Sequence, residues 1–172
     1  MLPNWLFIVF SILMLPFAMV VAFSGAPYLP TRKKQILDAI KLANLKPGDY
    51  VVDLGSGDGA VQKVLAEKGI HSLGYEVNPY LFLISKIRLH KYRKIAKVKL
   101  ANFWGQDLPK QTSVVFVFLL DKYMERLDVK LKDQSHKLQK PLNLISFAFK
   151  IPGKDPIKIK GGMFLYGYKI KG

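Results

Sequence analysis

The chain of 172 residues has no cysteine, only three histidines and few acidic side chains. Without cysteine it forms neither a disulfide nor a thiolate metal site. The scattered His71, His90 and His136 lack the spacing of metal ligands, so we predict no metal site. Twelve Asp and Glu residues against 27 Lys and Arg residues leave a formal net charge of +15. Such a charge favours a polyanionic neighbour, either anionic lipid or nucleic acid, without choosing between them.

The segment before Arg32 contains no charged residue. Trp5 to Phe23 is an almost unbroken apolar run, which as a helix is about 28 Å long and matches the roughly 30 Å hydrocarbon core of a bilayer. A signal peptide normally opens with a positive region, which is missing here. We therefore interpret residues 1–24 as a retained, single-pass transmembrane anchor and residues 25–172 as one domain. The first basic residues follow the anchor, so the positive-inside rule places this domain on the cytoplasmic face of the membrane.

Beyond a proline-rich connector, strand-like and helix-like patterns alternate along the chain, and the last stretch alternates around Gly161 and Gly162 as a hairpin does. We predict an α/β fold with a Rossmann-like, mostly parallel sheet, helices on both faces and a C-terminal antiparallel hairpin, preceded by one transmembrane helix. The expected helices are 31–43, 60–69, 79–94 and 122–134, and the expected strands are 50–55, 71–77, 98–101, 113–120 and 143–149.

The stretch VVDLGSGDGA, residues 51–60, reads as a strand that runs into a glycine-lined turn. Glycines in such a turn let the backbone approach a ligand closely. Asp53 and Asp58 belong to this stretch, and Glu76 ends the neighbouring strand, where ligands of open parallel sheets bind. A carboxylate in the position of Glu76 can accept hydrogen bonds from both hydroxyls of a ribose, which predicts a ligand that contains a nucleoside.

Two nucleoside cofactors are in question. Gly55, Gly57 and Ala60 satisfy the dinucleotide-binding pattern, so NAD is one of them. However, Asp53 and Asp58 would repel a pyrophosphate, whereas S-adenosylmethionine has no phosphate and presents an ammonium and a sulfonium. The carboxylates therefore favour S-adenosylmethionine, and a glycine-rich turn without any ligand is the remaining alternative.

DLGSGDG followed by GYEVNPYL resembles motif I and the acidic motif of class I, seven-strand methyltransferases. Taken with GAPYLPT, QILDAIKLANLKPGDY, NFWGQDL and FLLDKYMERLDVKL behind one apolar span, the chain is similar to the membrane-anchored protein-lysine methyltransferases. That family includes the mitochondrial lysine methyltransferase that acts on the ATP synthase c-ring protein, and its bacterial relatives. The similarity runs from the anchor to about Lys132, and beyond it QKPLN stands where the family has a Pro-Gly turn.

The resemblance implies roles for individual residues at the cofactor. Asp53, Gly55, Gly57 and Asp58 match positions that contact the methionine moiety of S-adenosylmethionine. Glu76 matches the position that binds its ribose.

Three further residues take their implied roles from the same resemblance. Asn102 would hydrogen-bond the adenine amino group, and Phe103 would cover the adenine ring or simply pack at the end of a strand. Tyr28 would close over the cofactor and help to shape the lysine channel, or it belongs only to an extended linker.

The implied activity is methylation of a lysine in a small membrane protein close to the bilayer surface. The connector after Phe23 spans at most roughly 28 Å, which keeps the site near that surface. Methyl transfer from a sulfonium to a neutral amine needs alignment and an environment that disfavours the protonated lysine, and the sequence shows no dedicated general base.

Two alternatives stay open. One is a methyltransferase that acts on RNA, lipid or quinone. No NPPY-like tetrapeptide follows the fourth expected strand, where FLLDKY stands, and this disfavours nucleic acid. The other is a non-catalytic, membrane-tethered nucleotide-binding module.

Overall fold

The structure, a computed structural model, describes residues 3–12, 14 and 31–170. Residues 4–12 are helical, and the side chains of Trp5, Phe7 and Phe10 on this helix are exposed. Much of the expected anchor at 1–24, and Tyr28, lie outside the described residues. Among the residues that the structure does describe, no helix combines the length and the apolar character needed to cross a membrane.

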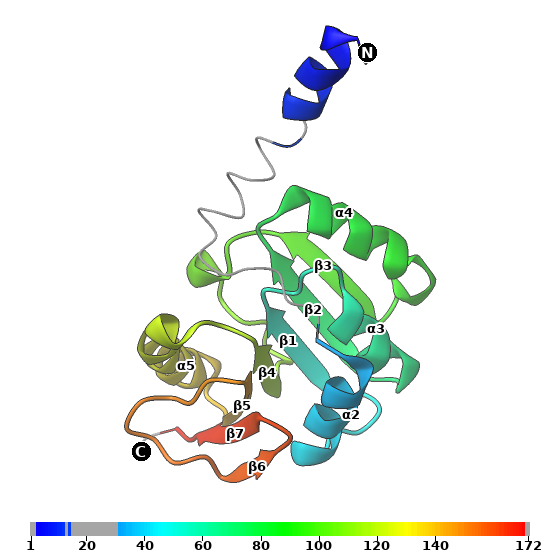
Figure 1. Cartoon of the computed structure of the whole chain (residues 1–172). Coiled ribbons are helices and arrows are strands. Elements are labelled where there is room, and N and C mark those ends of the chain that lie inside the picture. Colours follow the sequence, from blue (N-terminus) through cyan, green and yellow to red (C-terminus); the bar gives the residue numbers. More distant parts are fainter. Residues whose placement is uncertain (1–2, 13, 15–30, 171–172) are drawn as a thin grey trace.

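A seven-stranded sheet in the order β3-β2-β1-β4-β5-β7-β6 forms the centre of the domain (Figure 1). The first five strands in this order are parallel, and β7 and β6 continue the sheet antiparallel. This arrangement confirms the predicted mostly parallel α/β sheet with a C-terminal hairpin. The strands are β1 Tyr50–Leu54, β2 His71–Glu76, β3 Ala96–Leu100, β4 Val114–Val117, β5 Leu142–Phe147, β6 Lys158–Lys160 and β7 Met163–Tyr168.

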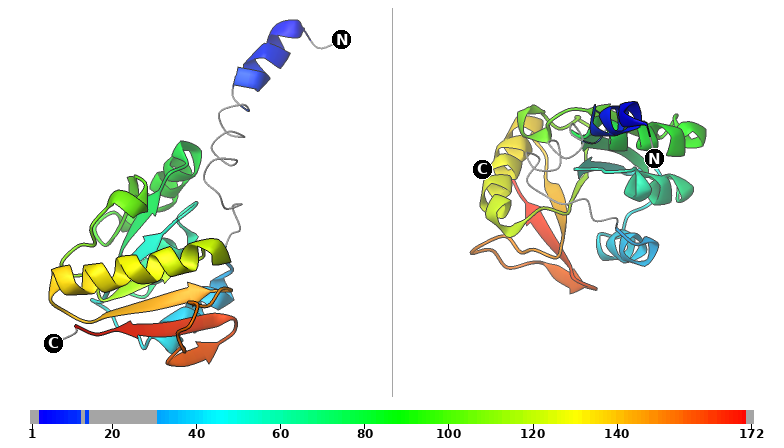
Figure 2. Two further views of the ribbon diagram at one scale, coloured as in Figure 1. Left: turned by 90° about the vertical axis from the view of Figure 1, so that its left-hand side faces the viewer. Right: turned by 45° about the horizontal axis from the view of Figure 1, so that its top comes forward.

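Helices cover both faces of the sheet, as Figure 1 and Figure 2 show. Successive strand residues point to opposite faces, so Val51 and Val114 pack beneath α2 and α3, whereas Val52 and Val115 pack beneath α5. Helix α4 joins α3 on the first face through a small cluster around Leu89. The helices are α2 Lys33–Leu42, α3 Ala60–Glu67, α4 Pro79–Arg88 and α5 Met124–Leu138, with short 3-10 turns η1 His90–Tyr92, η2 Phe103–Gly105 and η3 Asp121–Tyr123.

Several element boundaries differ from the predicted ones. Helix α2 begins after Arg32 instead of Thr31, because the Gln35 side chain accepts a hydrogen bond from the Arg32 N–H at 2.7 Å and closes the first turn. The predicted helix over 79–94 ends at Arg88 and continues only as the 3-10 turn η1. Helix α5 runs on to Leu138, because the buried Gln134 accepts a hydrogen bond from the Leu108 N–H and holds this polar end against the domain.

The sheet register brings the expected site residues together. Leu54 of β1 pairs with Tyr75 of β2 and with Val117 of β4, so the carboxyl ends of three parallel strands lie side by side. The loop after β1 and the end of β2 therefore share one edge of the sheet, as the sequence predicts.

Candidate functional site

The loop after β1 takes a backbone course that depends on glycine. Gly55, Gly57 and Gly59 all have positive φ angles, of 102°, 55° and 79°. The N–H groups of Gly55 and Ser56 both donate to the Tyr75 carbonyl at 3.0 Å, which fastens the loop to the end of β2. A Cβ added at Gly55 would meet no other atom within 4 Å, so the space beside this backbone is open to a ligand.

Glu76 ties the loop to the next helix. Its buried carboxylate accepts hydrogen bonds from the Gly57 N–H and from the Asn78 N–H, both at 2.7 Å. Asn78 in turn begins α4, and its side chain accepts from the N–H of Tyr80 at 2.9 Å and of Leu81 at 3.3 Å. Each Glu76 oxygen has one hydrogen bond from the backbone and keeps a lone pair for another donor.

Asp53 is a buried carboxyl group at the floor of this loop. Its side chain is 2% exposed and accepts one hydrogen bond, from Gln62 Nε2 at 2.9 Å. Burial raises the pKa of Asp53 to about 7, the Gln62 hydrogen bond opposes the rise, and the charge of Glu76 adds to it. Asp53 thus exchanges its proton near neutral pH, and a cation placed beside it would favour the charged form.

Gln62 and Gly74 are site residues that the sequence analysis missed. Gln62 is fully buried on α3, and its Oε1 has no hydrogen-bond partner among the described residues. A Cβ at Gly74 would lie 2.4 Å from the Ser56 Cβ and 2.6 Å from Gln62 Nε2, so only glycine lets the loop and Gln62 pack against β2. A polar residue between the apolar residues of α3 was the available signal for Gln62, whereas Gly74 gave none.

The structure changes the expectation for Asp58. Its carboxylate forms an ion pair with the Arg88 guanidinium at the end of α4, and it also accepts a hydrogen bond from the Ala60 N–H at 3.2 Å. The charge of Asp58 is therefore balanced within the chain, contrary to the expectation that both aspartates present free charge to a ligand. Asp53 and Glu76 are the two carboxyl groups at this edge without a basic partner among the described residues.

The end of β3 forms an aromatic corner. The side chain of Asn102 accepts a hydrogen bond from the Trp104 N–H at 3.1 Å and begins η2. Phe103 belongs to the hydrophobic core, with its ring centroid 4.6 Å from that of Trp104. Trp104 also lies 6.3 Å from Tyr123, and the Arg126 guanidinium lies 4.2 Å above its ring. The adenine roles of Asn102 and Phe103 stay predictions, and Trp104 is an aromatic neighbour that the sequence analysis did not assign.

Comparison with known proteins supports one family. Residues 53–158 match the family described as the ANTKMT methyltransferase domain. The human lysine N-methyltransferase named for the ATP synthase c-ring protein is 30% identical over 137 residues, which cover 78% of this chain and 57% of that protein. A protein-lysine N-methyltransferase of Saccharolobus islandicus is 30% identical over 144 residues, or 79% of this chain and 86% of that protein. The chain thus spans a little over half the length of the vertebrate ATP synthase methyltransferases that it matches.

A solved structure supports the fold. The RNA methyltransferase from Salinibacter ruber in complex with S-adenosyl-L-homocysteine has a TM-score of 0.71, with 22% sequence identity. The match covers 83% of this chain and 94% of that one, so the two proteins share nearly the whole described sheet and its helices.

Proposed function

Because the chain belongs to the ANTKMT methyltransferase domain family, we propose that it is an S-adenosylmethionine-dependent methyltransferase that modifies a lysine of a membrane protein. The observation that carries this proposal is the pair of buried carboxyl groups at the loop. Asp53 and Glu76 lie at one sheet edge, beside glycines whose backbone is open to a ligand.

The residues present fit the cofactor. Glu76 has lone pairs free for two ribose hydroxyls, while Gly57 and Asn78 hold its carboxylate in place. Asp53 has a pKa near 7 and gains its negative charge most readily when a cation lies close by. When bound, S-adenosylmethionine supplies a methyl group activated by a sulfonium. In the proposed site, Asp53 and Glu76 hold this group, and Asn102 lies at the end of β3 for the adenine.

A protein lysine is the proposed acceptor because two relatives, one human and one archaeal, are named lysine methyltransferases. The acceptor amine must be neutral to attack the methyl group. Because a low-dielectric site and a neighbouring cation both lower the pKa of a lysine, the protein needs mainly to exclude water and to align the amine.

We further propose that residues 1–24 anchor the chain in a membrane, with the catalytic domain on the cytoplasmic face. The apolar run up to Phe23 and the basic residues 32–34 directly after the connector support this placement. The exposed apolar side chains of the helix over residues 4–12 agree with it. The substrate would then be a membrane protein with a lysine near the headgroups.

The direct test is transfer of radiolabelled methyl groups to a membrane fraction from cells that lack the protein. We expect the full chain to label one small membrane protein as methyllysine. Glu76→Gln should lose this labelling, because an amide can accept only one of the two backbone hydrogen bonds and carries no charge. Glu67→Gln is the matched control, since Glu67 is exposed at the far end of α3 and makes only weak surface ion pairs.

Other outcomes would contradict parts of the proposal. Label in RNA or lipid would refute the protein substrate and leave the methyltransferase activity intact. Equal labelling by the Glu76→Gln variant would refute the proposed cofactor site.

A further inference from the structure

Helix α4 exposes its apolar residues and buries a polar one. Leu83, Ile84 and Ile87 are 58%, 46% and 78% exposed, whereas Ser85 is fully buried. At 100° per residue, the three apolar side chains share one arc of the helix surface. A surface helix of a globular protein normally has the opposite pattern, so this face is apolar without a partner among the described residues.

The inward face of α4 explains why a small residue occupies its centre. A Cβ on Gly59 would lie 3.0 Å from the Ser85 Cβ, so the helix crosses directly over the glycine loop. The Ser85 hydroxyl donates to the Phe82 carbonyl at 2.7 Å and therefore needs no other partner. The close crossing accounts for Ser85, but it does not account for three large apolar side chains on the outside.

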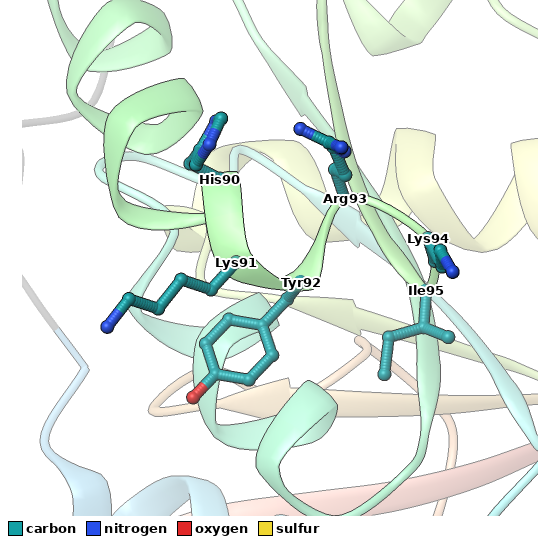
Figure 3. A pocket seen from close by; sticks show the side chains of 6 residues that line it. All are labelled: His90, Lys91, Tyr92, Arg93, Lys94 and Ile95. Carbon is teal, nitrogen blue, oxygen red and sulfur yellow. The ribbon is translucent and has the colours of Figure 1, made fainter.

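Basic residues surround this apolar face. From position 77 to position 106 the sequence contains seven Lys and Arg residues and no Asp or Glu. Lys86 lies on α4 itself, and the turn after the helix forms an open hollow whose lining is shown in Figure 3. In this view the side chains of His90 and Arg93 extend to one side of the turn and those of Lys91 and Tyr92 to the other. Asp58 is paired with Arg88 and so offsets only one of these seven positive charges.

We propose that α4 and the turn after it form a docking surface for an anionic bilayer. This α4 docking surface consists of Leu83, Ile84, Lys86, Ile87, Lys91 and Lys94, all exposed. The apolar side chains enter the boundary between headgroups and acyl chains, and the lysines contact lipid phosphates. The inference rests on the proposed membrane function. A lipid surface fits better than a nucleic acid, because a phosphate backbone would use the lysines and leave the leucine and isoleucine side chains in water.

The docking surface also has a consequence for catalysis. Helix α4 begins at Pro79, three positions after Glu76, and its end is bound to the glycine loop through Arg88 and Asp58. A bilayer held against α4 therefore fixes the orientation of the cofactor site relative to the membrane. An anchor with a connector alone limits only the distance of the domain from the membrane, whereas a second contact also restricts its rotation.

The absence of cysteine makes a clean test possible. Ile87→Cys in the full chain can be labelled at one position with an environment-sensitive fluorophore, and Val129→Cys, an exposed apolar position on α5, is the matched control. Both are mixed with vesicles of phosphatidylcholine and phosphatidylglycerol in equal parts, with or without brominated lipid. We expect a blue shift and quenching by brominated lipid at position 87, and neither effect at position 129.

A second variant isolates the charge contribution. Lys86→Glu, Lys91→Glu and Lys94→Glu, combined in the Ile87→Cys chain, should abolish the quenching at position 87 on the anionic vesicles. Equal signals at positions 87 and 129, or quenching that survives charge reversal, would overturn the proposal. Release of position 87 from the vesicles by a short RNA duplex would also overturn it and would assign the surface to nucleic acid.

The same samples separate this inference from the proposed function. Sedimentation of the chain with pure phosphatidylcholine vesicles reports the anchor, and binding of S-adenosylmethionine reports the cofactor site. If the chain sediments and binds the cofactor while position 87 stays in water, only the α4 docking surface is refuted. Loss of sedimentation or of cofactor binding would instead refute the corresponding part of the proposed function.

Discussion

Two buried aspartates show how the halves of this domain differ. Asp53 in the first half has one neutral hydrogen-bond donor, Gln62, and burial raises its pKa to about 7. In the second half, burial also acts to raise the pKa of Asp128, but hydrogen bonds from Lys132 and Tyr168 and the charge of Lys154 bring it below its ordinary value. The same side chain is thus fully neutralised where it joins α5 to the C-terminal strand, and left without a cation where a ligand is proposed to bind.

The difference separates support from function. Asp128 accepts from the Tyr168 hydroxyl at 2.8 Å and from Lys154 Nζ at 3.3 Å, so it fastens α5 to β7 and to the segment before β6. Asp53 fastens little and costs stability when it is charged. A group of the second kind, in an open cleft at the end of parallel strands, is the pattern expected of a functional site.

The largest expected effect is a pH dependence of stability caused by Asp53. The folded chain holds this proton more tightly than the unfolded chain, so the folded state binds more protons between about pH 4 and pH 7. The contribution of Asp53 to the free energy of unfolding therefore falls as pH rises through this window, by up to about 4 kcal/mol for a shift of about three pKa units, and is level above it. Urea unfolding of Asp53→Asn should lack this fall. A constant difference between the two proteins from pH 4 to pH 8 would contradict the raised pKa.

The next largest effect concerns Glu76 and the cofactor. Removing its charge should weaken binding of S-adenosylmethionine by about 100-fold, since two charge-assisted hydrogen bonds are each worth about 1.5 kcal/mol. Titration calorimetry of Glu76→Gln against the parent chain measures this loss. Binding by the parent should also strengthen as pH rises to about 7, because the charged form of Asp53 favours a cation. Equal affinities of the two proteins would remove Glu76 from the site.

A smaller effect is expected in the second half. Asp128→Asn removes the negative charge shared by Lys132, Lys154 and Tyr168 and should destabilise the fold by about 2 kcal/mol. Affinity for S-adenosylmethionine should remain unchanged in this variant at temperatures where it is folded. A large loss of affinity without loss of stability would erase the distinction between the two aspartates.

The smallest effect is expected at Arg88. Arg88→Ala breaks a partly exposed ion pair, which should lower the free energy of unfolding by less than about 1 kcal/mol. Because Asp58 then lacks its partner, affinity for the cationic cofactor should rise modestly. Weaker binding would show that Arg88 acts by holding the loop in shape and not by balancing charge.

Most of the fold was predictable because its signals are local. The apolar strands, the glycine turns and the proline at the start of α4 each reflect residues adjacent in sequence, and the parallel sheet follows from the alternation of strand and helix. The position of β7 between β5 and β6 was not predictable, because the hairpin pattern around Gly161 and Gly162 shows that two strands pair but not which of them joins the sheet.

At the site, the sequence by itself determined the glycine loop after β1 and the acid at the end of β2, since the backbone conformation of glycine and the parallel register place them at one edge. The tertiary structure alone decided which charges stay uncompensated. Gln62 reaches Asp53, Arg88 reaches Asp58 and Ser85 lies against Gly59 through packing between helices and the loop, and no spacing in the sequence encodes such contacts. The physical reason is that burial and electrostatic partners depend on three-dimensional neighbours, whereas turns and strands depend on neighbours along the chain.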